Sequence, residues 1–149
     1  MAITKYVARY TAHARGIGGR TGFVRMESDS MKFDLAIPGT LQWKTTSTNP
    51  EELFACGLVA SFGAALEEAA NTKSIMLQDA LVQADVHLRQ EGARKALSAE
   101  LYFSVPGMSH AMAATLVEMA WGLCPYARAM RGNVPMMIHI NNHILLHAA

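Results

Sequence analysis

Alternating apolar and polar positions mark the expected strands in the first third of this chain. Residues 5–14 alternate in this way, which predicts a half-buried strand. Residues 22–27 and 32–37 are two further short candidates, joined by Ser28-Asp29-Ser30, whose side chains bond their own backbone in turns. We therefore expect a three-stranded meander that ends at Pro38-Gly39.

A long apolar helix is expected next. Asn49 is suited to cap it, and Pro50 needs no amide partner at the first helical position. Glu51 and Glu52 add favourable negative charge to the first turn. The pattern predicts a helix to about Asn71, with apolar residues on every face, so the helix must be enclosed all round. A single sheet cannot do that, and we expect a second subunit to supply part of the cover as a two-fold dimer.

The second half of the chain combines a hairpin with two helices and a last strand. Residues 81–90 and 97–105 alternate on either side of a turn, which predicts a long hairpin. Ser109 can cap a second helix, and Cys124-Pro125 interrupts it and begins a short third helix that ends near Gly132. Residues 134–140 then alternate as a strand.

The expected element order is three strands, a helix, two strands, two helices and a strand. Because the strands are segregated, this order favours an α+β fold over a doubly wound sheet. The sequence shows no internal repeat, so we expect one domain over residues 1–149. A chain of this length can bury about two thirds of the surface exposed by its unfolded form.

Charge and hydropathy limit the cellular locations and binding partners that we expect for this protein. With 13 basic and 12 acidic residues, no charge surplus attracts nucleic acid or anionic lipid. The first residues lack the pattern of a secretory signal, so we expect a cytoplasmic protein. The longest apolar block, residues 53–66, is shorter than the roughly 20 residues that cross a bilayer, which predicts a core helix and no membrane contact.

Two cysteines in a reducing compartment are either inert core thiols or a redox couple. Cys124 precedes Pro125 at the expected start of a short helix, where free amides favour a thiolate. The commoner alternative is a buried, unreactive cysteine. Three histidines near the end, His139, His143 and His147, are spaced by four and could hold a metal on a helix. Strand-like neighbours and the lack of a nearby carboxylate favour a solvated terminus, so we expect no metal.

Four short motifs resemble the OsmC/Ohr family, in its organic hydroperoxide resistance branch. They are Gly18-Gly19-Arg20, Thr48-Asn49-Pro50-Glu51-Glu52-Leu53-Phe54, Leu123-Cys124-Pro125-Tyr126 and Arg131-Gly132-Asn133. The resemblance implies the OsmC/Ohr-like fold, an intertwined homodimer with the long helices packed centrally, and an apolar pocket for alkyl or lipid hydroperoxides. It also implies recycling by dihydrolipoyl groups, including those of lipoylated proteins, and no metal or organic cofactor.

The resemblance also assigns roles to individual residues. The family's attacking cysteine falls on Ser61, and Cys124 matches the resolving thiol. In relatives the arginine at Arg20 stabilises the attacking thiolate and orients the peroxide, and the glutamate at Glu51 holds that arginine. Without the resemblance, Ser61 is an ordinary helix residue, Arg20 is solvated and Glu51 is a helix-dipole partner.

A serine at position 61 argues against peroxide reduction by this chain, because the reaction needs a thiolate and an atom that can form a sulfenic acid. Ser61 is either an engineered substitution that stops the reaction or a natural divergence. Leu58, Val59 and Cys56 also differ from the residues usual in the family, which slightly favours divergence. Cys56 cannot replace the lost thiol because it lies about 140° round the helix from Ser61, and we expect it in the core. Glu51 is about 15 Å from Ser61 along the helix, so it acts through an arginine or from another subunit.

Two functions remain open. The first is a thiol-dependent organic hydroperoxide reductase scaffold, inactive or impaired because Ser61 replaces the attacking cysteine. The alternative is a non-catalytic dimeric protein that binds a small apolar or lipid-like ligand. The residues expected to line an apolar pocket are Trp43, Leu58, Phe62, Met108 and Met112.

Overall fold

The computed structural model describes residues 8–28, 30–141 and 143–148, and for residues 143–148 it describes the backbone alone. The chain divides into two compact units, Met1–Pro50 and Glu51–Ala149, and each is described here by itself. Within the described residues the strands form two mixed sheets, one in each unit, and the fold is α+β as expected. The expectation of one domain over residues 1–149 stays a prediction.

The first unit contains a small sheet with the strand order β1-β2-β3-β4. Its elements are β1 (Ala14–Ile17), the 3-10 turn η1 (Gly19–Thr21), β2 (Phe23–Met26), β3 (Lys32–Leu35) and β4 (Ser47–Thr48). β2 and β3 pair antiparallel as expected, β1 pairs antiparallel with β2, and β4 adds to β3 in parallel. β4 was not expected, because two residues are too short to carry an alternating pattern.

The strand expected over residues 5–14 is wrong for most of its length. Residues 8–13 form no strand, β1 begins at Ala14, and residues 5–7 lie outside the described residues. The first residue of β1, Ala14, is aligned with Met26, which is the last residue of β2. Alternation shows that a segment could cover a core, whereas a strand also needs a neighbour to complete its hydrogen bonds.

Helix α1 (Pro50–Thr72) begins directly after Asn49 and ends one residue beyond the expected Asn71, which confirms the prediction from the capping signals. Its fully buried residues form one stripe at helical spacing, namely Leu58, Phe62, Ala65, Leu66, Ala69 and Ala70. Within the single chain one side of α1 is uncovered, because Cys56, Ala60 and Ala64 are exposed, and the expected cover by a second subunit stays a prediction. Small residues of high hydropathy lie at these positions, and hydropathy alone does not show which face packs.

By length and composition, α1 alone among the helices of the described residues could also cross a membrane. This is weak evidence, because the core helix of a soluble protein meets the same criterion. Leu58, Phe62 and Leu66 have almost no exposed surface and belong to the central apolar cluster of the second unit. Their burial fits the expected core helix.

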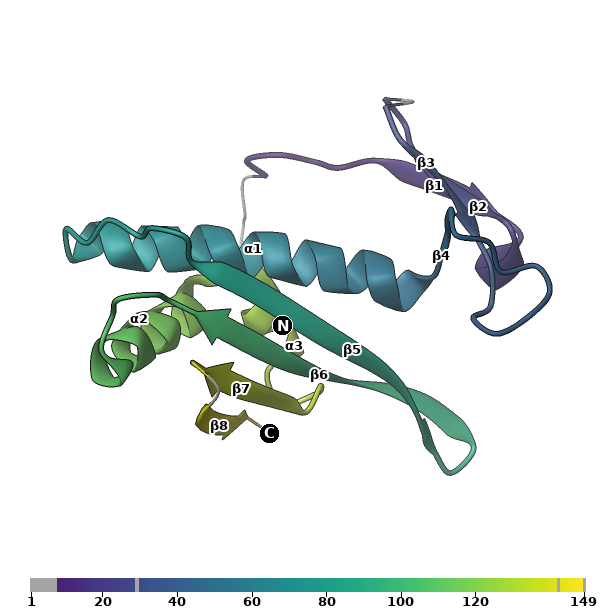
Figure 1. The fold of residues 1–149 in the computed structure, drawn as a ribbon. Coiled ribbons are helices and arrows are strands. Elements are labelled where there is room, and N and C mark those ends of the chain that lie inside the picture. Colours follow the sequence, from purple (N-terminus) through teal and green to yellow (C-terminus); the bar gives the residue numbers. More distant parts are fainter. Residues whose placement is uncertain (1–7, 29, 142, 149) are drawn as a thin grey trace, which may run out of the picture. The chain divides into compact units, whose positions relative to one another are not determined.

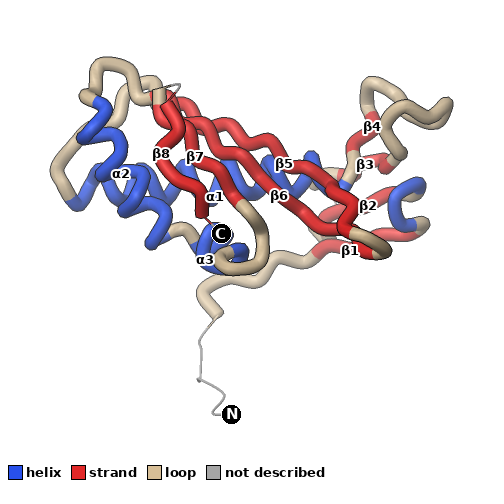
Figure 2. The backbone as a smooth tube through the Cα atoms, turned by 90° about the horizontal axis from the view of Figure 1, so that it is seen from below, coloured by secondary structure: helices blue, strands red, loops and turns tan. Residues whose placement is uncertain are grey.

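The second unit packs helices on one face of its sheet, which has the strand order β5-β6-β7-β8 (Figure 2). Its other elements are β5 (Leu81–Glu91), β6 (Arg94–Ser104), α2 (His110–Leu123), α3 (Pro125–Met130), β7 (Met136–Ile140) and β8 (His143–Ala148). β5 and β6 form the expected hairpin, and β7 runs parallel to β6 (Figure 1). Ser109 caps α2 by accepting a hydrogen bond from the Met112 amide at 3.3 Å, as predicted.

Residues 143–148 form a strand that was not expected, β8, which pairs antiparallel with β7. The spacing of four between His139, His143 and His147 therefore does not place them along a helix. The side chains of His143 and His147 lie outside the described residues. The expected element order lacks β4 and β8, and both strands are short additions at the edge of a sheet.

Successive side chains of β6 and β7 lie on opposite faces of this sheet. Ala99, Leu101 and Phe103 of β6 are buried, and the Phe103 ring lies 4.8 Å from the ring of Phe62 on α1. The residues between them, including Glu100 and Tyr102, therefore lie on the opposite face. The helix-covered face contains the candidate site, and the other face carries a polar cluster.

Candidate functional site

Ser61 and Cys124 contact each other in the second unit. The Ser61 Oγ lies 3.4 Å from the Cys124 Sγ, and either atom can donate the hydrogen bond. Ser61 lies in the middle of α1 and is half-buried, whereas Cys124 lies between α2 and α3 and is fully buried. The fold therefore brings together two residues that are 63 positions apart in the chain.

Cys124 is held in place because it ends one helix and begins the next. Its amide donates to the Ala120 carbonyl at 2.8 Å, which closes α2. Its Sγ accepts from the Ala127 amide at 3.5 Å, which caps α3, and Pro125 occupies the first position of that helix. The expected start of the third helix is confirmed, and the thiol is fixed by the backbone of both helices.

The residues expected to line an apolar pocket do not gather around Ser61. Leu58 and Phe62 are fully buried in the core and present no surface to a ligand. Met108 and Met112 line a cavity of about 540 Å³, formed with residues 75–78 and 105–109, which does not include Ser61 or Cys124. Trp43 belongs to the first unit. The expected lining is therefore wrong for Leu58 and Phe62, whereas Met108 and Met112 line a cavity that does not include Ser61.

Arg20 and Glu51 lie in different units of the structure. Arg20 is half-buried in η1, within the first unit, and Glu51 is half-buried in the first turn of α1, within the second. Glu51 and Ser61 belong to one continuous helix, so their positions are about 15 Å apart along its axis, as expected. The roles of Arg20 and Glu51 toward Ser61 stay predictions.

Cys56 is exposed, which corrects the expectation that it lies in the core. It precedes Ser61 by five residues on α1, and five residues rotate a helix by about 140° from the starting face. Cys56 therefore lies away from the stripe that packs on the sheet, and it does not share the side of Ser61 that contacts Cys124.

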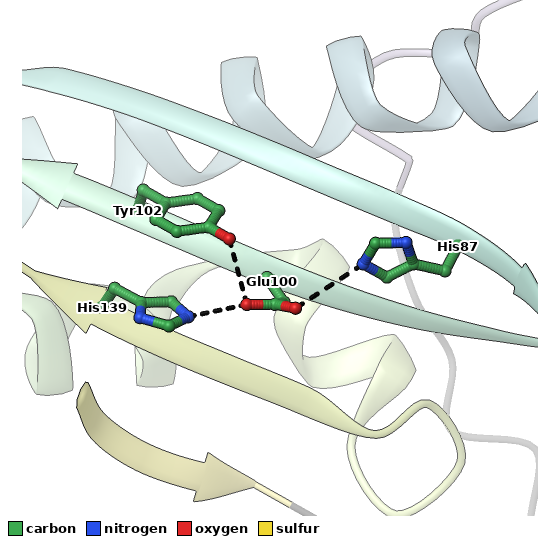
Figure 3. A network of polar contacts seen from close by, with 4 residues as sticks. All are labelled: His87, Glu100, Tyr102 and His139. Atoms are coloured by element: carbon green, nitrogen blue, oxygen red, sulfur yellow. Dashed lines mark hydrogen bonds and ion pairs between the residues drawn. The ribbon is translucent and has the colours of Figure 1, made fainter. Parts of the chain in front are cut away.

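A second polar cluster lies on the other face of the same sheet (Figure 3). Glu100 accepts hydrogen bonds from the Tyr102 hydroxyl at 3.0 Å and interacts with the His139 Nε2 at 2.8 Å. The His87 Nε2 lies 3.7 Å from its other oxygen. The Tyr102 and His139 rings stack with centroids 4.5 Å apart. The hydrogen bond from His139, followed by that from Tyr102, lowers the pKa of Glu100, while burial and the bond to Glu100 raise the pKa of Tyr102 to about 12.

This cluster depends on strand pairing that the sequence does not reveal. Tyr102 and His139 are registered partners across the parallel β6–β7 pair, so a carboxylate 39 residues from His139 becomes its nearest polar partner. The described residues contain no group of three His, Cys, Asp or Glu side chains that could hold a metal ion. We therefore assign the cluster to the cross-strand stability of β5, β6 and β7.

The fold and the site together define an α+β protein with a hydroxyl–thiol pair between its long helix and a short one. The chain belongs to the OsmC-like protein family, whose profile matches residues 44–139. It is 33% identical over 137 residues to the organic hydroperoxide resistance protein OhrB of Bacillus subtilis, covering 90% of this chain and 99% of the relative. It is 36% identical over 131 residues to the organic hydroperoxide resistance protein of Xanthomonas axonopodis pv. citri, covering 87% of this chain and 92% of that relative.

Solved structures agree with this relationship. The crystal structure of OhrB from Bacillus subtilis matches with a TM-score of 0.84 and 32% identity, covering 90% of this chain and 100% of the other. A putative organic hydroperoxide resistance protein from Vibrio cholerae, with captopril bound in one of its active sites, matches with a TM-score of 0.87 and 31% identity. That match covers 95% of this chain and 99% of the other.

Proposed function

We propose that this chain is an organic hydroperoxide resistance protein-like scaffold in which Ser61 occupies the position of the attacking cysteine. The observation that carries the proposal is the contact of 3.4 Å between the Ser61 Oγ and the Cys124 Sγ. A redox pair needs its two reacting atoms this close, because a disulfide bond is about 2.05 Å long. The relatives' names supply the substrate class, which is organic hydroperoxides.

The chemistry requires sulfur at position 61. A thiolate there attacks the O–O bond of an alkyl or lipid hydroperoxide, releases the alcohol and becomes a sulfenic acid. The Cys124 thiol then attacks that sulfur, water leaves, and the resulting disulfide is reduced by a dithiol of the dihydrolipoyl type. A serine hydroxyl is not ionised near neutral pH and forms no such intermediate, so the chain as written is inactive or impaired.

The remaining parts of the proposal follow the same family pattern. Arg20 would stabilise the thiolate and orient the peroxide, and Glu51 would hold Arg20 by a charge-assisted bond. We propose a homodimer in the cytoplasm, and the exposed side of α1 with Cys56, Ala60 and Ala64 supports a partner at this helix. A monomeric mass at micromolar concentration would contradict the dimer. The proposed peroxidase step uses no metal or organic cofactor.

The test is the consumption of tert-butyl or cumene hydroperoxide with dihydrolipoamide as reductant. We expect no turnover by the unsubstituted chain and clear turnover by Ser61→Cys, because only the variant has a thiol at the attacking position. Ser61→Ala is the matched control for a change at the same position without sulfur, and it should stay inactive. Equal consumption by the unsubstituted chain and by Ser61→Cys would refute the proposed role of Ser61.

The second candidate is a non-catalytic protein that binds a small apolar or lipid-like ligand. The cavity of about 540 Å³ favours it, because Met76, Met108 and Met112 give its wall an adaptable apolar surface. Absence of turnover in both the unsubstituted chain and Ser61→Cys, together with saturable binding of a fluorescent fatty acid, would favour the binding protein. Turnover by Ser61→Cys would favour the reductase scaffold.

A further inference from the structure

Tyr126 packs against α1 one helical turn before Ser61. A Cβ atom built at Gly57 would lie 3.1 Å from the Tyr126 hydroxyl oxygen and 3.3 Å from its Cε1. The same ring lies beside Phe54, with centroids 6.2 Å apart. Gly57 and Ser61 are four residues apart on one helix, so they share a face of α1. The absence of a side chain at Gly57 therefore lets the α3 segment approach α1 next to Ser61.

The position of Tyr126 is coupled to that of Cys124 by a short and stiff backbone. Only Pro125 separates the two residues, and its ring fixes one backbone dihedral. Cys124 also carries hydrogen bonds that close α2 and open α3, so it cannot rotate independently of α3. The Tyr126 ring is 40% exposed, and a shift of the α3 backbone that moves this ring away from α1 also moves the Cys124 Sγ.

We infer that Gly57 and Tyr126 form a positioning contact that keeps the Cys124 Sγ within bonding reach of residue 61. The catalytic use of this contact rests on the proposed function, whereas its geometry does not. Disulfide formation tolerates little displacement, because its bond length and dihedral angle are narrowly defined. A methyl group at position 57 must push the Tyr126 ring outward by a few tenths of an ångström, at the distances given above.

The chain offers a matched control in the same helix. A Cβ atom at Gly63 meets no atom within 4 Å, so Gly63→Ala adds the same methyl group without a neighbour. Both alanine substitutions raise the helix propensity of α1 by a similar amount. A difference between them therefore reports the contact with Tyr126 and not the helix itself.

The experiment measures the equilibrium between two thiols and a disulfide in the full-length Ser61→Cys protein. The protein is equilibrated in mixtures of reduced and oxidised glutathione, in which two protein thiols and one glutathione disulfide become one protein disulfide and two glutathione thiols. Acid quenching, alkylation and mass spectrometry give the oxidised fraction. Cys56→Ala is included in every variant, so that position 61 and Cys124 carry the only thiols of the protein.

We expect Gly57→Ala to lower the equilibrium constant for disulfide formation about tenfold, because strained disulfides are more easily reduced. Gly63→Ala should leave the constant within about twofold, since its methyl group meets no neighbour. Adding Tyr126→Phe to Gly57→Ala should recover part of the loss, because it removes the oxygen at 3.1 Å. This recovery would not follow from a general loss of stability.

An unchanged constant in Gly57→Ala, or an equal decrease in Gly63→Ala, would overturn the inference. If Gly57→Ala does not fold, Tyr126→Ala decides, because removal of the ring should also lower the constant and an unchanged value would overturn the inference. The measurement contains no hydroperoxide. Disulfide formation without peroxide turnover in Ser61→Cys would therefore contradict the proposed function alone, and failure of Ser61→Cys to form any disulfide would overturn the positioning contact.

Discussion

Replacing Ser61 by cysteine places a second sulfur atom beside Cys124, and the resulting disulfide should stabilise the protein. The present oxygen and sulfur atoms are 3.4 Å apart, and the bond needs a separation of about 2.05 Å. Both residues lie in the second unit, so the bond does not depend on the first unit. We expect the disulfide to form under mild oxidation.

The size of the effect follows from the length of the loop that the bond closes. The two residues are 63 positions apart, and the chain-entropy model gives about 4 kcal/mol of stabilisation at 25 °C for a loop of this length. For a protein of this size each kcal/mol raises the midpoint of thermal unfolding by about 2–4 °C, so the oxidised form should melt about 8–16 °C higher than the reduced form. Strain in the native bond would reduce this difference.

The assay compares the thermal unfolding of Ser61→Cys with and without reductant, in a Cys56→Ala background that prevents pairing between chains. Cys56→Ala without Ser61→Cys is the matched control, and its midpoint should not respond to the reductant. A disulfide that forms only between chains would refute the geometry of the site. The same holds for an intramolecular disulfide that leaves the midpoint unchanged.

Three further predictions test the rest of the structure. Alkylation of the native protein should spare the buried Cys124 until the protein unfolds, as peptide mass spectrometry will show. Phe62→Ala should lower the free energy of unfolding by about 3–5 kcal/mol in denaturant titrations, because its ring is fully buried, and a loss below about 1 kcal/mol would contradict this packing. Glu100→Gln should be less stable than the parent at pH 7. The pKa of Glu100 is lowered in the folded state, so its carboxylate stabilises the fold above the ordinary pKa of 4.5, and this stabilisation is lost as the pH falls through the lowered pKa. The difference in the free energy of unfolding between the two proteins should therefore become smaller in acid. A difference in the free energy of unfolding that does not change with pH would show that the charge of the carboxylate does not stabilise the fold.

The elements that sequence patterns predicted well are those with local start signals. Asn49 and Pro50 mark the start of α1, Ser109 marks α2 and Pro125 marks α3, and each signal acts within a few residues of its own position. The long hairpin was also predictable, because apolar and polar residues alternate over residues 82–88 and 97–103 of its two 11-residue strands.

The errors occurred where a strand depends on a distant partner. Residues 8–13 alternate like a strand but extend past the last residue of β2, and β8 exists because β7 offers it an edge. Pairing of this kind is a property of the whole sheet, so a local pattern cannot decide it. The same reason explains the cluster around Glu100, which the parallel register of β6 and β7 assembles.

The candidate site was predictable only in part. Spacing alone gave no reason to place Ser61 beside Cys124, and their pairing was expected from the resemblance to the family. The structure brings the two atoms together, whereas the expected apolar lining around them was wrong because Leu58 and Phe62 are core residues. Burial of a side chain on a uniformly apolar helix depends on which face meets the sheet, and the helix moment of such a sequence is weak.

The most direct test of the central claim is the intact mass of the protein after reaction with one equivalent of cumene hydroperoxide. The account predicts that Ser61→Cys, in the Cys56→Ala background, loses two hydrogen atoms as the disulfide with Cys124 forms, while one equivalent of the alcohol appears. Under the same conditions the Cys56→Ala protein with Ser61 intact should keep its mass and leave the peroxide unreacted. Stoichiometric conversion of the peroxide by the protein with Ser61 intact, or no disulfide in Ser61→Cys, would contradict the account.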